Sequence, residues 1–111
     1  MSAPKLNRQL VLEELVRVAD GMGGFTESWV SKGTLWANVS GRGASETQVG
    51  ARALPVLKLR VLVRAAPFGA DSRPRPDQRF RDGSRIMAIL AVGEMADNGQ
   101  YLEIWAEEGR L

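Results

Sequence analysis

The sequence predicts an all-β fold, a small β-barrel or sandwich of antiparallel hairpins with one long loop, and three observations predict it. Residues 57–65 alternate apolar and polar side chains with a period of two, which is typical of a half-buried strand. Residues 86–92 and 101–107 are two further strand-like segments, and Asp97-Asn98-Gly99 between them is a tight-turn sequence. No segment has a clear amphipathic helical pattern.

The length of 111 residues predicts a single domain, residues 1–111, with one modest core. Apolar residues make up 44% of the chain and charged residues 25%, as in globular domains. No run of 18 apolar residues is present, so we expect no membrane span. The first eight residues lack the apolar centre of a signal peptide, which predicts synthesis in the cytoplasm.

Each strand can be justified from its residues. In 57–65 one face is apolar and the other carries the basic side chains Lys58, Arg60 and Arg64. Segment 86–92 is apolar throughout and is predicted to be a central strand buried on both faces. Asp82-Gly83 predicts a turn that joins a short strand at 79–81 to the strand beginning near Arg85.

The N-terminal half is less clear. Residues 9–19 contain good helix formers but also alternate, so strand and helix both stay open there. We favour a long hairpin, in which the glycines of 21–24 form the turn and 25–39 is the returning strand. Residues 41–55 are polar, contain glycines and have no period, so we expect a long loop; loops of that length are usually functional or disordered.

The composition argues against an enzyme. Cysteine and histidine are both absent, which excludes disulfides, thiolate or imidazole metal sites and the common nucleophilic triads. The adjacent carboxylates Glu13-Glu14 and Glu107-Glu108 point to opposite faces of a strand, so we expect them to be solvated rather than catalytic. We therefore predict no catalytic, cofactor-binding or metal-binding residues.

Charge is distributed unevenly along the chain. Residues 50–85 carry nine basic and three acidic groups, whereas 86–111 carry one basic and five acidic groups. Four arginines at even spacing would form one row on an extended chain: Arg73, Arg75, Arg79 and Arg81. Such a row would face either a phosphate backbone or the acidic segment of a neighbouring subunit. Trp29 and Trp36 are expected to pack in the core or in an interface.

The order of these features resembles the phage head–tail joining family, whose members are also called head-closure or stopper proteins. The matching stretches are Leu6-Asn7-Arg8, Asp20-Gly21-Met22-Gly23-Gly24, Leu35-Trp36-Ala37-Asn38-Val39, the strand from Leu57 to Arg64, Arg79-Phe80, Gly83-Ser84-Arg85-Ile86, and the closing hairpin around Ile89-Leu90-Ala91-Val92 and Tyr101 to Glu107. One departure is Arg64-Ala65-Ala66, where the family commonly has Arg-Tyr.

The resemblance implies a structural subunit of the head–tail junction of a phage or a gene-transfer-agent-like particle. It implies a homo-oligomeric ring between a portal–adaptor ring and the tail terminator or tail tube, with double-stranded DNA in its channel and no cofactor. In relatives the loop corresponding to 41–55 lines or plugs the channel, which makes Arg42, Glu46 and Arg52 the expected DNA-channel residues. We further expect the basic stretch of one subunit to meet the acidic stretch of the next.

Two other functions remain possible interpretations of the sequence. The first is a stand-alone nucleic-acid-binding barrel similar to an OB-fold, which needs exposed aromatic residues among basic ones. The sequence separates Trp29 and Trp36 from the arginines of 73–85, which counts against it. The second is a tail-terminator subunit, although such proteins tend to be longer and to carry helices.

Overall fold

The structure, a computed structural model, describes the backbone of residues 4–49, 52–95 and 99–109, and their side chains except those of 42–49 and 52–55. Six strands form an antiparallel sheet that closes into a barrel in the order β1-β2-β3-β6-β5-β4. The strands are β1 (Arg8–Ala19), β2 (Phe25–Val49), β3 (Arg52–Arg64), β4 (Arg79–Asp82), β5 (Arg85–Glu94) and β6 (Tyr101–Gly109). The all-β prediction is confirmed, and 9–19 is strand. None of the described residues belongs to a helix that could cross a membrane.

The barrel interior is filled by alternate residues of all six strands. On β3 these are Leu59, Val61 and Val63, as the period-two pattern predicted, and on β6 they are Leu102, Ile104 and Ala106. The other strands contribute Leu10, Leu12, Ala37, Phe80, Met87 and Ile89. Because side chains alternate across a strand, the residues between these point outwards, and the core is a single apolar cluster.

Strand β5 differs from its prediction as a strand buried on both faces. It does lie inside the sheet, between β4 and β6. Met87 and Ile89 are buried, but Leu90 is 45% exposed on the outer face. The reason is that a closed barrel has only one interior, and no other strand in the described part of the chain packs on the outside of β5.

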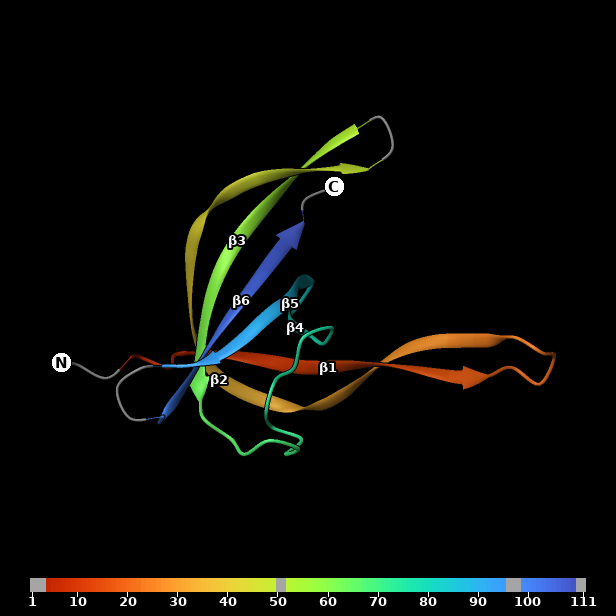
Figure 1. Cartoon of the computed structure of the whole chain (residues 1–111), viewed down its shortest axis with the longest axis horizontal. Coiled ribbons are helices and arrows are strands. Elements are labelled where there is room, and N and C mark those ends of the chain that lie inside the picture. The colour runs from red at the N-terminus through yellow and green to blue at the C-terminus, as the bar shows by residue number, and fades with distance from the viewer. Residues whose placement is uncertain (1–3, 50–51, 96–98, 110–111) are drawn as a thin grey trace.

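The β1–β2 hairpin extends well beyond the barrel (Figure 1). Among the described residues, strand β1 pairs with β4 at Val11, Leu12 and Glu13, and past that point β2 is the one strand that pairs with β1. The register shifts between Leu12 and Glu13, where the hairpin leaves the barrel. We call residues 14–31 the β1–β2 arm.

The tip of this arm is the Gly-rich turn that the sequence predicted. Gly21 and Gly23 have φ angles of 81° and 84°, a region that glycine adopts without steric cost. The Asp20 carboxylate accepts hydrogen bonds from the backbone N–H of Met22 at 2.7 Å and of Gly24 at 3.1 Å. The turn is therefore fixed by its own side chain.

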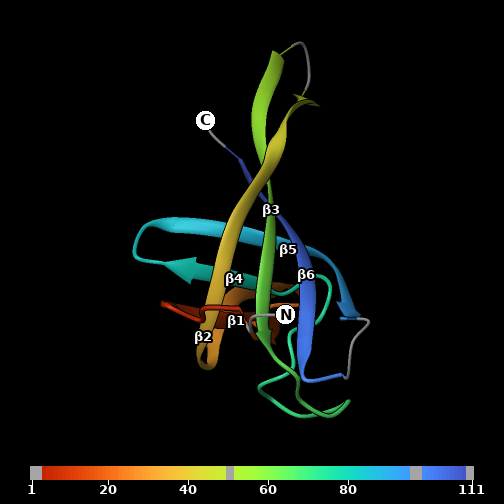
Figure 2. The ribbon, with the colours of Figure 1, turned by 90° about the vertical axis from the view of Figure 1, so that its left-hand side faces the viewer.

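The predicted long loop at 41–55 is wrong. Residues 41–49 continue β2, residues 52–55 begin β3, and the two pair in register from Gly43↔Lys58 to Val49↔Arg52 with an irregularity between Gly41 and Gly43. Since β6 pairs with β3 only from Val56 onwards, the end of this hairpin stands clear of the barrel (Figure 2). We call residues 46–55 the β2–β3 arm. A strand with no interior to face needs no apolar alternation, which is why this segment resembles a loop in sequence.

Candidate functional site

The four evenly spaced arginines do not form one row. Arg73 is buried, donates from Nη1 to the Ala66 carbonyl oxygen at 2.9 Å and lies 3.8 Å from the centroid of the Phe68 ring. Arg75 forms an ion pair with Glu14. Arg79 and Arg81 lie on β4 and face β1. Each of the four side chains therefore has a partner within its own chain.

Arg79 and Arg81 converge on Glu13. Nε of Arg79 donates to one Glu13 carboxylate oxygen at 2.7 Å, and Nε of Arg81 donates to the other at 2.9 Å. The Glu13 residue is only 6% exposed. Burial raises the pKa of this carboxyl, but the hydrogen bonds and positive charges of Arg81 and Arg79 outweigh it and hold the pKa below its ordinary value. The Arg79 guanidinium also lies 4.0 Å from the centroid of the Trp29 ring.

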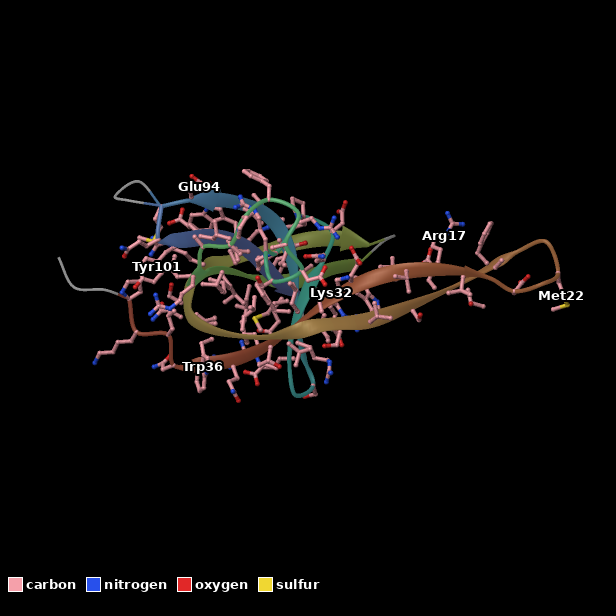
Figure 3. The ribbon with its side chains drawn as sticks, turned by 90° about the horizontal axis from the view of Figure 1, so that it is seen from below. Arg17, Met22, Lys32, Trp36, Glu94 and Tyr101 are labelled. Atoms are coloured by element: carbon pink, nitrogen blue, oxygen red, sulfur yellow. The ribbon has the colours of Figure 1, made fainter. Side chains whose placement is uncertain are left out.

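On the opposite face of the same hairpin, Glu14 forms ion pairs. Glu14 pairs with Arg75, and its other oxygen lies 3.5 Å from the Lys32 Nζ atom. Lys32 lies at the base of the arm (Figure 3) and is also 3.5 Å from an Asp71 carboxylate oxygen. Arg75 and Asp71 belong to the segment between β3 and β4, so this segment braces the arm.

Together these contacts clamp the base of the β1–β2 arm on both faces. Glu13 and Glu14 point to opposite faces, as predicted, but the prediction that they are solvated is wrong. The same prediction is wrong for Glu108, which is buried. The sequence alone does not predict that Glu13 is buried. Its burial depends on the register of β1 against β4, which makes Arg79 its direct cross-strand neighbour. The arrangement is suited to fixing the direction of an arm rather than to acid–base chemistry.

The uneven charge along the sequence is balanced within the subunit. On the outside of the barrel, Lys58 contacts Glu107 at 2.8 Å and Arg60 contacts Glu103 at 2.6 Å, both between β3 and β6. Arg85 donates two hydrogen bonds of 2.9 Å to Glu108, which raises the pKa of Arg85. The basic and acidic stretches thus pair within one chain through these residues, so their charges alone do not predict a contact between subunits.

The two tryptophans of β2 lie in different surroundings. The prediction that both are distant from the arginines is wrong for Trp29, whose ring is covered by Arg79. A covered ring face is not available to stack on a base, so the contact does not favour an OB-like nucleic-acid site. Trp36 is 54% exposed and lines a groove with Leu6 and Arg64 at the other end of the barrel.

The described residues contain neither an acidic metal-binding cluster nor an unpaired buried polar side-chain atom. They contain no group of three or more acidic side chains that could hold a metal ion. Their buried side-chain nitrogen and oxygen atoms all have hydrogen-bond partners. What the described surface offers is a barrel with two projecting hairpins.

Comparison with known proteins connects this architecture to a family. The family model described as "Phage head completion protein" matches residues 1–109. The chain belongs to the phage head completion protein family. The expected structural role in completing the head at its junction with the tail is thereby confirmed at the level of the family. The comparison with curated protein sequences finds no match.

Two of the solved structures that are similar to this head completion protein extend the comparison. A chain in the structure "Virion of native gene transfer agent (GTA) particle" is 50% identical, with a TM-score of 0.86 and coverage of 97% of this chain and 98% of that one. The solution structure of a protein from Shigella flexneri 2a is 20% identical, with a TM-score of 0.69 and coverage of 97% and 96%. The second likeness shows the fold alone.

The expected channel residues of this head completion protein lie on the β2–β3 hairpin. In the backbone register Glu46 pairs with Pro55 and Arg52 pairs with Val49 near the tip, while Arg42 lies at the irregularity beside Gly41. The side chains of all three lie outside the described residues. Their expected role therefore remains a prediction about this arm.

Proposed function

We propose that the protein is a non-enzymatic connector subunit that works as a ring of identical copies at the head–tail junction of a phage-like particle. The observation that carries this proposal is the family match over residues 1–109, supported by 50% identity to a chain of a gene transfer agent virion. A compact barrel with two projecting hairpins is suited to holding neighbours on several sides. The ring would have a portal–adaptor ring on one side and the tail terminator or tail tube on the other.

Within this ring we assign the β2–β3 arm to the DNA channel. The arm carries Glu46 and Arg52, with Arg42 just before it, and it projects away from the barrel in a direction different from that of the β1–β2 arm (Figure 1). Any DNA contact made here should be independent of sequence, because every part of a genome passes the same point. The arginines of 73–81 are less suited to this role, since their described contacts lie within the subunit.

The family-level role can be tested by deleting the gene in a particle-producing cell. The proposal expects filled heads that lose DNA and do not acquire tails, and complementation by the intact gene should restore joined particles. Particles that assemble and transfer DNA normally without the protein would refute the proposal.

The channel role can be tested separately by shortening the β2–β3 arm. Ser45 pairs with Val56, so replacing 46–55 by Asn-Gly would close the hairpin with a two-residue turn and keep the register. A channel element predicts joined particles that leak or fail to release DNA. If tails no longer joined while DNA stayed in the heads, the arm would instead be a contact to a neighbouring ring.

A further inference from the structure

The distal part of the β1–β2 arm carries an unusual amount of exposed apolar surface. Nine large apolar side chains are exposed in the described part of the chain, and five of them lie on this arm: Leu15, Val18, Met22, Phe25 and Val30. Met22 at the tip is 88% exposed. These side chains lie on both faces of the ribbon, Leu15 and Phe25 on one and Val18 and Val30 on the other, and a two-stranded ribbon has no core in which to bury them. So much exposed apolar surface on one element of a monomer is typical of an interface.

A groove that could receive the tip lies at the far end of the same molecule. It consists of two adjoining hollows of about 470 and 270 Å³ that share Leu6, Trp36 and Arg64 as lining residues. The remaining lining is largely apolar and includes Leu35, Val63 and Tyr101. An exposed aromatic wall beside small apolar residues is the setting in which a methionine or phenylalanine anchor binds well.

Charge favours the same pairing. Asp20 is the one charged residue between 18 and 25, and its carboxylate is held at the tip by hydrogen bonds to the turn. Among the described residues that line the groove, the one charged side chain is Arg64. Arg17 lies 4.7 Å from the centroid of the Phe25 ring but is paired with Glu27, so Asp20 leaves the tip with a net negative charge. The groove carries the positive charge of Arg64, which favours docking of the tip there.

The positions of the tip and the groove determine which kind of oligomer their contact would form. Met22 and the pair Trp36 and Tyr101 lie at opposite ends of the longest axis of the molecule (Figure 3). The tip therefore cannot reach the groove of its own chain, and its contact with another copy is head-to-tail. Head-to-tail contacts generate a closed ring when the rotation between copies closes.

We infer that the tip of the β1–β2 arm of one copy docks into the Trp36–Arg64 groove of the next copy, and that this contact closes the ring. The inference rests on the proposed ring and names its interface. The ion pairs of Glu13 and Glu14 at the base of the arm then fix the direction in which the arm projects towards the neighbouring subunit.

Disulfide trapping in assembled particles tests the contact, and the natural absence of cysteine makes it specific. Met22→Cys combined with Thr34→Cys places one thiol at the tip and one in the groove wall. After mild oxidation we expect a ladder of covalent multimers of the subunit on a non-reducing gel. Each single variant should give monomer, and a mixture of the two single variants should stop at dimer.

Two further pairs make the result decisive. Ala19→Cys with Ala65→Cys is a second trapping pair, since both residues are exposed and Ala65 lines the groove. Met22→Cys with Ser84→Cys is the matched control, because Ser84 lies in the exposed turn between β4 and β5 and not in the groove. The control should give no ladder.

The outcomes separate this inference from the proposed function. If particle images show a ring at the junction but neither pair is trapped, the docking contact is wrong and the proposed function stands. A disulfide between the Met22→Cys variant and an adaptor or tail protein carrying a native cysteine, identified by mass spectrometry, would also overturn it. Particles with a single copy of the protein, or none, would end both the inference and the proposed ring.

Discussion

The barrel and the β1–β2 arm both carry large apolar side chains, which are buried in the barrel and exposed on the arm. On β1 itself, Leu10 and Leu12 are fully buried, whereas Leu15 and Val18 further along the strand are 38% and 53% exposed. The barrel surrounds its apolar side chains with six strands, while the arm has two strands and no interior. Apolar alternation therefore indicates a strand, but it does not say whether the subunit or a neighbour covers the apolar face.

The two regions also use charge differently. Around the barrel, cross-strand pairs such as Lys58 with Glu107 lie on the outer surface and are partly exposed. At the base of the arm, Glu13 is nearly buried between Arg79 and Arg81. Glu108 at the end of β6 is similarly buried and is paired with Arg85. We expect the buried carboxylates to matter for stability and the partly exposed outer pairs to matter little.

The largest effect should come from the barrel interior. Phe80→Ala removes a fully buried ring between β1 and β5 and should lower the free energy of unfolding of the isolated subunit by about 4 kcal/mol. Urea unfolding measures the change. A loss below about 1 kcal/mol would mean that the barrel is not the part that holds the subunit together.

The next effect concerns the clamp of the arm. Glu13→Gln leaves two arginines facing a neutral group and should cost about 2 kcal/mol at pH 7. Because the folded-state pKa of Glu13 is lowered, its contribution is present at neutral pH and is lost as the pH falls below 4.5 through the lowered value. The difference between the variant and the natural protein should therefore vanish in acid. A difference independent of pH would contradict the ionised clamp.

A matched change on the outer surface should be much smaller. Glu107→Gln removes the same charge from an ion pair whose side chains are 40% and 31% exposed, and should cost about 0.5 kcal/mol. The comparison of the two Glu→Gln variants by denaturant unfolding isolates the effect of burial. Equal costs would show that the position of the charge does not matter.

The smallest effect on the isolated subunit should come from the tip of the arm. Met22→Ser changes a side chain that contacts little in its own chain and should alter stability by less than about 0.5 kcal/mol. The same variant should reduce the yield of tailed, DNA-filled particles, because the apolar tip is lost from the subunit contact. A normal yield of particles would argue against a role of the tip in assembly.

The sequence predicted the strands whose alternate apolar side chains fill the barrel interior. The period-two pattern of β3 predicted its buried residues, which are Leu59, Val61 and Val63. The Asp82-Gly83 sequence predicted the turn between β4 and β5. The strand character of 41–49 and 52–55 could not be predicted, because this hairpin has no barrel interior to face near its end and its residues show no apolar period. Leu90 was predicted to be buried because hydrophobicity alone does not reveal that one face of β5 has no cover.

The candidate site was harder to predict than the fold. The even spacing of Arg73, Arg75, Arg79 and Arg81 suggested one surface, but the chain turns between them. Only the register of β4 against β1 reveals that Arg79 and Glu13 are neighbours. The contact between Arg79 and Glu13 joins residues 66 positions apart. Such a contact depends on the strand topology, which cannot be predicted from a local sequence pattern.

Hydrogen–deuterium exchange in two states tests the contrast between barrel and arm most directly. In the free subunit, amides of the β1–β2 arm should exchange quickly, because an uncovered two-stranded ribbon opens at little cost, while barrel amides should be strongly protected. In assembled particles the amides of 14–31 should become protected and those of the barrel should change little. Arm amides that are already as protected in the free subunit as those of the barrel, or that stay unprotected in the particle, would contradict the account.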